Sequence, residues 1–166
     1  MDQAGVLADA FNRVAVFVHE VLDELDPDDL VWQPDAGGNT IGWMVWHLIR
    51  IQDDHVAHVA GREQVWTAQG WADRLKMPFD AGDTGYGHSA DDVAQVQVSG
   101  QDLVEYFDAV HAQTQEFVAT LSAEDLDRVV DTRWDPPITL GVRLVSVIAD
   151  DLQHIGQAAY VRGMLP

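Results

Sequence analysis

The 166-residue sequence contains no cysteine. This excludes disulfide bonds, cysteine-ligated zinc and a cysteine nucleophile within the chain. Basic residues are also scarce. The chain has 9 Lys and Arg but 28 Asp and Glu, which gives a formal net charge of −19. Such a charge repels phosphate backbones and anionic lipid surfaces. We therefore expect no binding to nucleic acid or to membranes.

Long apolar runs are missing as well, and none approaches the ~20 residues that a membrane-spanning helix needs. The first residues, Met1 to Gly5, lack the basic start of a signal peptide. We therefore expect a cytoplasmic protein. Hydrophobic residues make up 47% of the chain, which suits one domain, residues 1–166, with a sizeable core.

Apolar residues recur at helical spacing in several long segments. The long helices that this pattern predicts cover residues 3–25, 40–60, 99–121 and 138–162. Asn39 or Thr40 would cap the second helix and Thr139 the last. Without a convincing sheet, these segments predict an all-α four-helix bundle.

The connection between the second and third helices, residues 61–98, is long and irregular. We expect a short helix over residues 62–75, followed by a turn-rich, aromatic stretch over residues 77–88. A connection of this length is often functional. It would form a lid or rim across a site, or else cap the bundle or contact a second copy. We do not expect His88, in the turn-rich stretch, to be a metal ligand.

The last predicted helix carries polar residues on its inward face. Asp150 and His154 are four residues apart, so they stand one above the other with roughly 5–6 Å between their Cβ atoms. Asp151 could replace Asp150 less comfortably. A buried carboxylate is costly unless it is paired or bound to a metal. The residues therefore either converge on one ion or hydrogen-bond to one another at the edge of the apolar face.

A histidine also lies on the inward face of the second predicted helix. Met44, His47, Leu48 and Ile51 follow one another at core spacing, which turns His47 towards the interior. If the two helices are neighbours, His47, Asp150 and His154 could complete a three-ligand site. Three protein ligands leave coordination positions open, as in catalytic rather than structural metal sites.

Three motifs carry a resemblance to a known family: Trp32-Gln-Pro34, Asn39-Thr40-Ile-Gly with the later His47-Leu48, and Asp150-x-x-x-His154-x-Gly156-Gln157. The sequence resembles the DinB-like (DinB/YfiT) superfamily over nearly its whole length. Within that group it is most similar to the branches related to mycothiol-dependent maleylpyruvate isomerase and thiol S-transferases.

This resemblance implies a four-helix bundle with down-up-up-down order and a metal site at His47, Asp150 and His154. Many members have histidine where this chain has Asp150, whereas the mycothiol-linked branch has a carboxylate there. The shorter aspartate reaches less far than a glutamate would.

Two imidazoles and a carboxylate suit Zn²⁺, Ni²⁺, Fe²⁺ or Mn²⁺. The sequence thus predicts a metal-dependent enzyme that activates a low-molecular-weight thiol for S-transfer or isomerisation of a small-molecule substrate. Gln157 and Arg162 are candidate substrate-binding residues. The alternatives are a metal-dependent hydrolase with the same ligands, a non-catalytic metal- or ligand-binding stress protein, and a bundle whose polar residues only order the core. A homodimer is expected by analogy alone.

Overall fold

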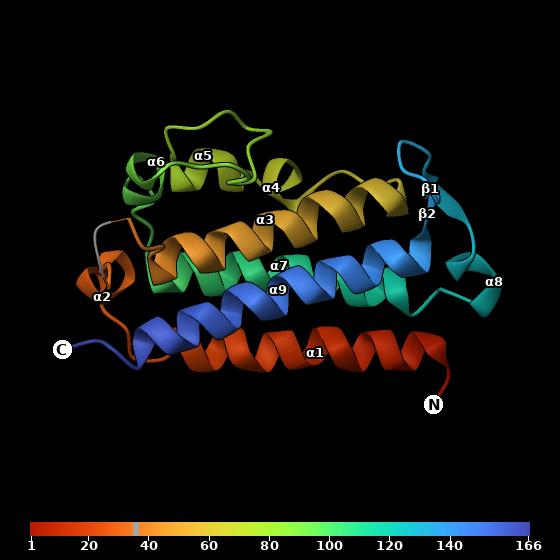
Figure 1. Cartoon of the computed structure of the whole chain (residues 1–166), viewed down its shortest axis with the longest axis horizontal. Coiled ribbons are helices and arrows are strands. Elements are labelled where there is room, and N and C mark those ends of the chain that lie inside the picture. The colour runs from red at the N-terminus through yellow and green to blue at the C-terminus, as the bar shows by residue number, and fades with distance from the viewer. Residues whose placement is uncertain (35–36) are drawn as a thin grey trace.

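The computed structural model describes residues 1–34 and 37–166. Its four long helices are α1 (Gln3–Leu22), α3 (Ile41–Ala60), α7 (Gly100–Val118) and α9 (Leu140–Arg162). Figure 1 shows α1 and α9 running in one direction and α3 and α7 in the other. The predicted all-α class and down-up-up-down order are therefore confirmed. The parallel pair α3 and α7 requires the long connection between them.

Side-chain caps fix where these helices begin. Thr40 Oγ1 accepts a hydrogen bond from the Trp43 N–H at the start of α3, and Thr139 Oγ1 caps α9 in the same way. The helix predicted over residues 3–25 ends earlier, at Leu22. The backbone becomes extended at Asp23, because the chain leaves α1 there and starts the next helix three residues later, where Asp26 forms a capping box.

Short elements occupy the connections. In chain order they are α2 (Pro27–Val31), α4 (Val65–Ala68), α5 (Trp71–Leu75), α6 (Ala90–Ala94), α8 (Ala123–Leu126), β1 (Val129–Asp131) and β2 (Ile138–Thr139). Gly70, in a left-handed conformation, splits the short helix that we expected over residues 62–75 into α4 and α5. Residues 138–139, expected to begin the last helix, instead pair with β1 as an antiparallel strand. Thr139 remains extended because it is the N-cap of α9.

The core lies between the four long helices. Helix α3 packs against α9 and α7, and α1 packs against the same two helices from the other side. Large side chains such as Phe11, Trp46 and Phe107 are fully buried there. Within the described part of the chain, no helix combines the length and apolar character needed to cross a bilayer.

A buried polar network holds the 61–98 connection on α3. Both carboxylate oxygens of Asp53 are used: one accepts from the Val65 N–H, and the other from the Trp66 N–H and the Tyr106 hydroxyl. The Arg50 guanidinium lies 3.6 Å from the Asp53 carboxylate and donates through Nε to the Asp83 carbonyl. Charges buried in this way are stable only when paired and hydrogen-bonded. The network therefore fixes the start of the connection and its turn at Asp83 relative to α3.

Candidate metal centre

His47, on α3, faces α9 near the middle of the bundle. Its side chain is 6% exposed. Burial lowers the pKa of His47, although the Thr84 hydrogen bond and the nearby Asp150 carboxylate act in the opposite direction. The lowered pKa keeps the imidazole neutral near pH 7, which is the form that binds metals.

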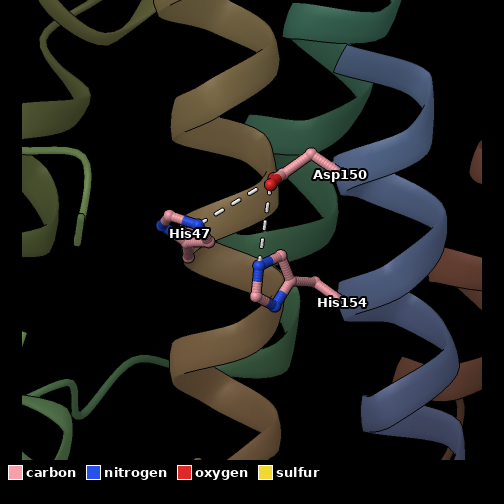
Figure 2. Close-up of side chains that lie close together, drawn as sticks. All are labelled: His47, Asp150 and His154. Atoms are coloured by element: carbon pink, nitrogen blue, oxygen red, sulfur yellow. Dashed lines mark ion pairs between the residues drawn. The ribbon is translucent and has the colours of Figure 1, made fainter. Parts of the chain in front are cut away.

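Asp150 and His154 face His47 from α9, one turn apart (Figure 2). Asp150 Oδ2 lies 3.9 Å from His47 Nε2, and Asp150 Oδ1 lies 3.8 Å from His154 Nε2. The two imidazole rings meet edge to face, with centroids 4.6 Å apart. One ligand atom from each of these residues lies within 4.8 Å of the other two. The convergence predicted from the sequence is thus present.

The group fits a small cation. Ligand atoms around an ion with bonds of ~2.0–2.2 Å lie about 3.0–3.5 Å apart. The three ligand atoms lie within 4.8 Å of one another, so the side chains would have to close by up to about 1–2 Å. Asp150 Oδ2 and His154 Nδ1 are buried with no hydrogen-bond partner among the described residues. An unpaired buried polar atom is costly. A cation bound between the three side chains would satisfy the carboxylate oxygen.

Residues of the long connection hold His47 from the opposite side. His47 Nδ1 donates a hydrogen bond to the Thr84 carbonyl, with a separation of 2.5 Å. A carbonyl only accepts, so the proton is on Nδ1 and Nε2 is left free to bind an ion. Gly85 follows with φ +88°, and a Cβ there would lie 2.9 Å from His47 Nδ1. The described contacts thus place this turn behind His47 as a support.

Trp43 links the two histidines and the connection. Its indole stacks on the His47 ring, with the ring centroids 4.8 Å apart and an angle of 5° between the ring planes. The indole and the His154 ring pack edge to face. Trp43 Nε1 donates to His88 Nδ1, and His88 Nε2 lies 3.1 Å from the Asp83 carboxylate. His88 thus contacts Trp43 and Asp83 on its two ring nitrogens and supports the stacked Trp43 from the side of the connection.

Asp151 is the other acid on this turn of α9. Its side chain is fully buried, and neither carboxylate oxygen has a hydrogen-bond partner in the described residues. Burial, together with the neighbouring Asp150 charge, raises the pKa of Asp151. Asp150, not Asp151, contributes the carboxylate of the converging group.

The two predicted substrate-binding residues lie at different places. Gln157 is exposed one turn after His154 and lines a cavity between α9 and the start of α3. Arg162 donates hydrogen bonds to the carbonyls of Glu20 and Asp23, at the end of α1. Its guanidinium therefore ties α9 to α1, two turns beyond His154.

The fold and the site define a four-helix bundle with a candidate His–Asp–His metal centre between two antiparallel helices. Residues 10–158 match the family model described as the DinB superfamily, and the chain belongs to that superfamily. It is also similar to the crystal structure of a conserved protein from Enterococcus faecalis. That similarity has a TM-score of 0.91 and 27% sequence identity, and covers 98% of this chain and 96% of the other. No curated protein matches the sequence.

Proposed function

We propose that this DinB-superfamily protein binds one divalent cation through His47 Nε2, the Asp150 carboxylate and His154, and uses it to activate a low-molecular-weight thiol. The observation that carries the proposal is the convergence of three ligand atoms from two helices within 4.8 Å. The unpartnered Asp150 Oδ2 supports it. The reaction would be an S-transfer or isomerisation of the type found in the mycothiol-dependent branch.

The donor set suits Zn²⁺, Ni²⁺, Fe²⁺ or Mn²⁺. When bound, the cation would supply an open coordination position that holds the thiol sulfur and lowers the pKa of the thiol. His47 and His154 would bind as neutral imidazoles, and the Thr84 carbonyl would keep His47 in the required tautomer. Asp150 would offset part of the cation charge.

An open position distinguishes an enzyme from a structural metal site. A structural site would need a fourth protein ligand. Among the described residues no fourth His, Asp or Glu joins the group, and His88 is occupied by Asp83 and Trp43. This favours catalysis over a purely structural ion. Water in place of the thiol would make the same centre a hydrolase, and a non-catalytic metal-binding protein is the second alternative.

The expected partners are small molecules in the cytoplasm, and a charge of −19 disfavours polyanions. A homodimer is part of the proposal. It would be supported by exposed apolar side chains along α9, where Val142 is 52%, Val145 58% and Leu152 40% exposed.

The first experiment is metal analysis of untagged protein by mass spectrometry, comparing wild type with His47→Ala and His154→Ala. His19→Ala is the matched control, because His19 is half-exposed and pairs with Asp108 away from the site. We expect about one divalent ion per chain in wild type and control, and none in the two site variants. Equal metal content in all four proteins, or none after reloading wild type, would refute the metal centre.

Thiol binding is then measured on protein reconstituted with Co²⁺. A thiol that binds the cation gives a charge-transfer absorption band. We expect this band in wild type on titration with 2-mercaptoethanol. A loaded protein that shows no band with any thiol would rule out thiol activation and leave the hydrolase or the binding protein.

A further inference from the structure

Helix α9 has an outer face without charge. It lies on the near side of the bundle in Figure 1, between α3 and α1. Its four charged residues, Arg143, Asp150, Asp151 and Arg162, are all at least partly buried. The exposed residues of α9 are Val142, Val145, Ser146, Ala149, Leu152, Gln153, Gly156, Gln157, Ala159 and Tyr160. In a chain with 28 acids, an uncharged face of this length is typical of a protein–protein contact, since the centre of an interface is depleted of charge.

Six of these residues form one continuous apolar row, the α9 seam: Val142, Val145, Ala149, Leu152, Gly156 and Ala159. They follow one another in alternating steps of three and four residues, the spacing that keeps side chains facing a second helix packed along the first. The three larger side chains are 52%, 58% and 40% exposed. The seam thus has the period of a helix–helix contact while it faces outward.

The seam is complementary to itself when a second α9 runs antiparallel to it. A two-fold axis level with the peptide bond between Asp150 and Asp151 makes each contact occur twice. It pairs Val142 with Ala159, Val145 with Gly156, and Leu152 with Ala149. Every pair joins a larger side chain with a small one, so that a knob faces a hole. A parallel pairing would instead set Gly156 against Gly156, which leaves a gap, and Leu152 against Leu152.

Gly156 is the deepest hole of the seam. A Cβ at this position would meet no described atom within 4 Å, and glycine in a helix interior is about 1 kcal/mol less favourable than alanine. Contacts within the described chain therefore give no reason for glycine here. Together with Leu152 and, from α1, Phe17, Gly156 lines a cavity of about 340 Å³. Val145 of a second copy would enter this space.

The size of the contact requires α1 as well as α9. The seam extends over ~26 Å of helix axis, whereas a standard interface buries about 800 Å² on each partner, more than one helix face supplies. Phe17, 44% exposed, extends the apolar surface onto α1, and Glu20 and Arg162 add charges of opposite sign at the same cavity. A second copy is the partner that fits, because two chains of charge −19 avoid strong repulsion only where the centre of the contact carries no acid.

We propose that two copies of the chain pair through their α9 seams, antiparallel and about this two-fold axis, with Val145 of each copy seated against Gly156 of the other. This inference rests on the homodimer of the proposed function and not on its metal centre. The candidate ligands on α9 face His47 on α3 (Figure 2) and do not belong to the seam.

Sedimentation equilibrium tests the surface. We expect wild type to be a dimer, and Val145→Glu to raise the dissociation constant of the dimer at least ~100-fold, because the new charge would be buried without a partner. Tyr86→Glu is the control, since it adds the same charge to a side chain that is 91% exposed in the 61–98 connection. Metal content should be equal in all three proteins. A Val145→Glu dimer as tight as wild type would overturn the inference and leave a homodimer through another face. A wild type that stays monomeric at every concentration would also refute the homodimer of the proposed function.

Introduced cysteines test the direction of the pairing, because the chain has none of its own. In the antiparallel dimer, Val145→Cys and Gly156→Cys proteins should form a disulfide-linked dimer on mild oxidation only when they are mixed. Each cysteine lies ~16 Å along the helix axis from the same residue of the other copy, beyond the Cα separation of about 4.4–6.8 Å that a disulfide needs. A cross-link in either variant alone would overturn the antiparallel arrangement.

A compensating pair tests the fit of Val145 to Gly156. Gly156→Val should weaken the dimer at least ~10-fold, because two valines would then compete for one space. Val145→Ala in the same chain should restore it, since the larger and the smaller side chain only exchange places. Failure of this second change to restore the dimer would show that the two residues do not face each other.

Discussion

The imidazole of His47 is held through Nδ1 by the carbonyl of Thr84, 37 residues further along the chain. Because the carbonyl can only accept, this bond selects the tautomer whose Nε2 lone pair faces Asp150. The turn that carries Thr84 is held in place by Arg50, which donates to the Asp83 carbonyl. The long connection is therefore a structural part of the candidate metal centre.

The turn offers a matched pair of glycines to test this role. Gly85 and Gly87 both have positive φ, +88° and +79°, but only at Gly85 would a Cβ collide with His47 and Trp46. Substitution by alanine should strain the backbone at either position by roughly 1–2 kcal/mol. We expect Gly85→Ala to weaken metal affinity 10–100-fold, the usual effect of losing an outer-shell contact, and Gly87→Ala to change it less than about threefold. Isothermal titration with Zn²⁺ measures both, and equal losses would contradict a specific support of His47.

The Asp53 network predicts a large stability effect away from the site. Asp53→Ala leaves the Arg50 charge buried without a carboxylate and removes the acceptor for the Val65 and Trp66 N–H groups. We expect a loss of about 3–5 kcal/mol in the free energy of unfolding, a large share of the 5–15 kcal/mol typical of a domain. Urea unfolding measures it.

The neighbouring Asp54→Ala is the control for that loss. The Asp54 side chain is 37% exposed, and its replacement should cost little beyond its hydrogen bond to Gln64. Similar losses of unfolding free energy in the two variants would show that the buried Asp53 network stabilises the fold no more than a partly exposed hydrogen bond does.

The sequence alone predicted the long helices, the Thr40 and Thr139 caps and the convergence of His47 with Asp150 and His154. These features depend on local spacing. Helical periodicity places each side chain on a face, and an i, i+4 pair on one helix needs only one partner from a neighbouring helix.

What the sequence did not predict depends on contacts between distant residues. Arg50 and Asp53 are charged residues on an amphipathic helix, and such residues usually face water. Their burial follows from Tyr106, 53 residues beyond Asp53. The bond from Thr84 to His47 uses a backbone carbonyl, so no side-chain pattern reports it. Its one trace in the sequence is the cluster of glycines from Gly82 to Gly87, of which Gly85 needs the space that only glycine leaves.

The buried histidines should contribute stability to the metal-free protein that rises with pH up to about 6.5. Burial lowers the pKa of His111, as it does for His47 and His55. Between the lowered pKa and the usual ~6.5, the unfolded chain binds more protons than the native protein, so the free energy of unfolding increases with pH. The contribution is complete above ~6.5 and is lost as the pH falls through the native pKa.

His111→Gln isolates one of these groups far from the site, where His111 hydrogen-bonds to Asn12. Urea unfolding in the presence of a chelator should show a smaller pH slope in the variant, by at most about 1.4 kcal/mol per pH unit. Identical slopes in the two proteins would mean that His111 has its ordinary pKa in the native state.

Asp150→Asn separates metal binding from stability. The Asp150 carboxylate lies beside the buried Asp151 and contributes to the raised pKa of Asp151. Removing its charge should leave the free energy of unfolding of the apoprotein unchanged, or increase it by up to about 1 kcal/mol, as is common when a site residue is replaced. Metal affinity should fall at least tenfold, because a carboxamide is a weaker ligand than a carboxylate. Full metal affinity in Asp150→Asn, together with its loss in Asp151→Asn, would instead make Asp151 the ligand and require the α9 turn to rotate when metal binds.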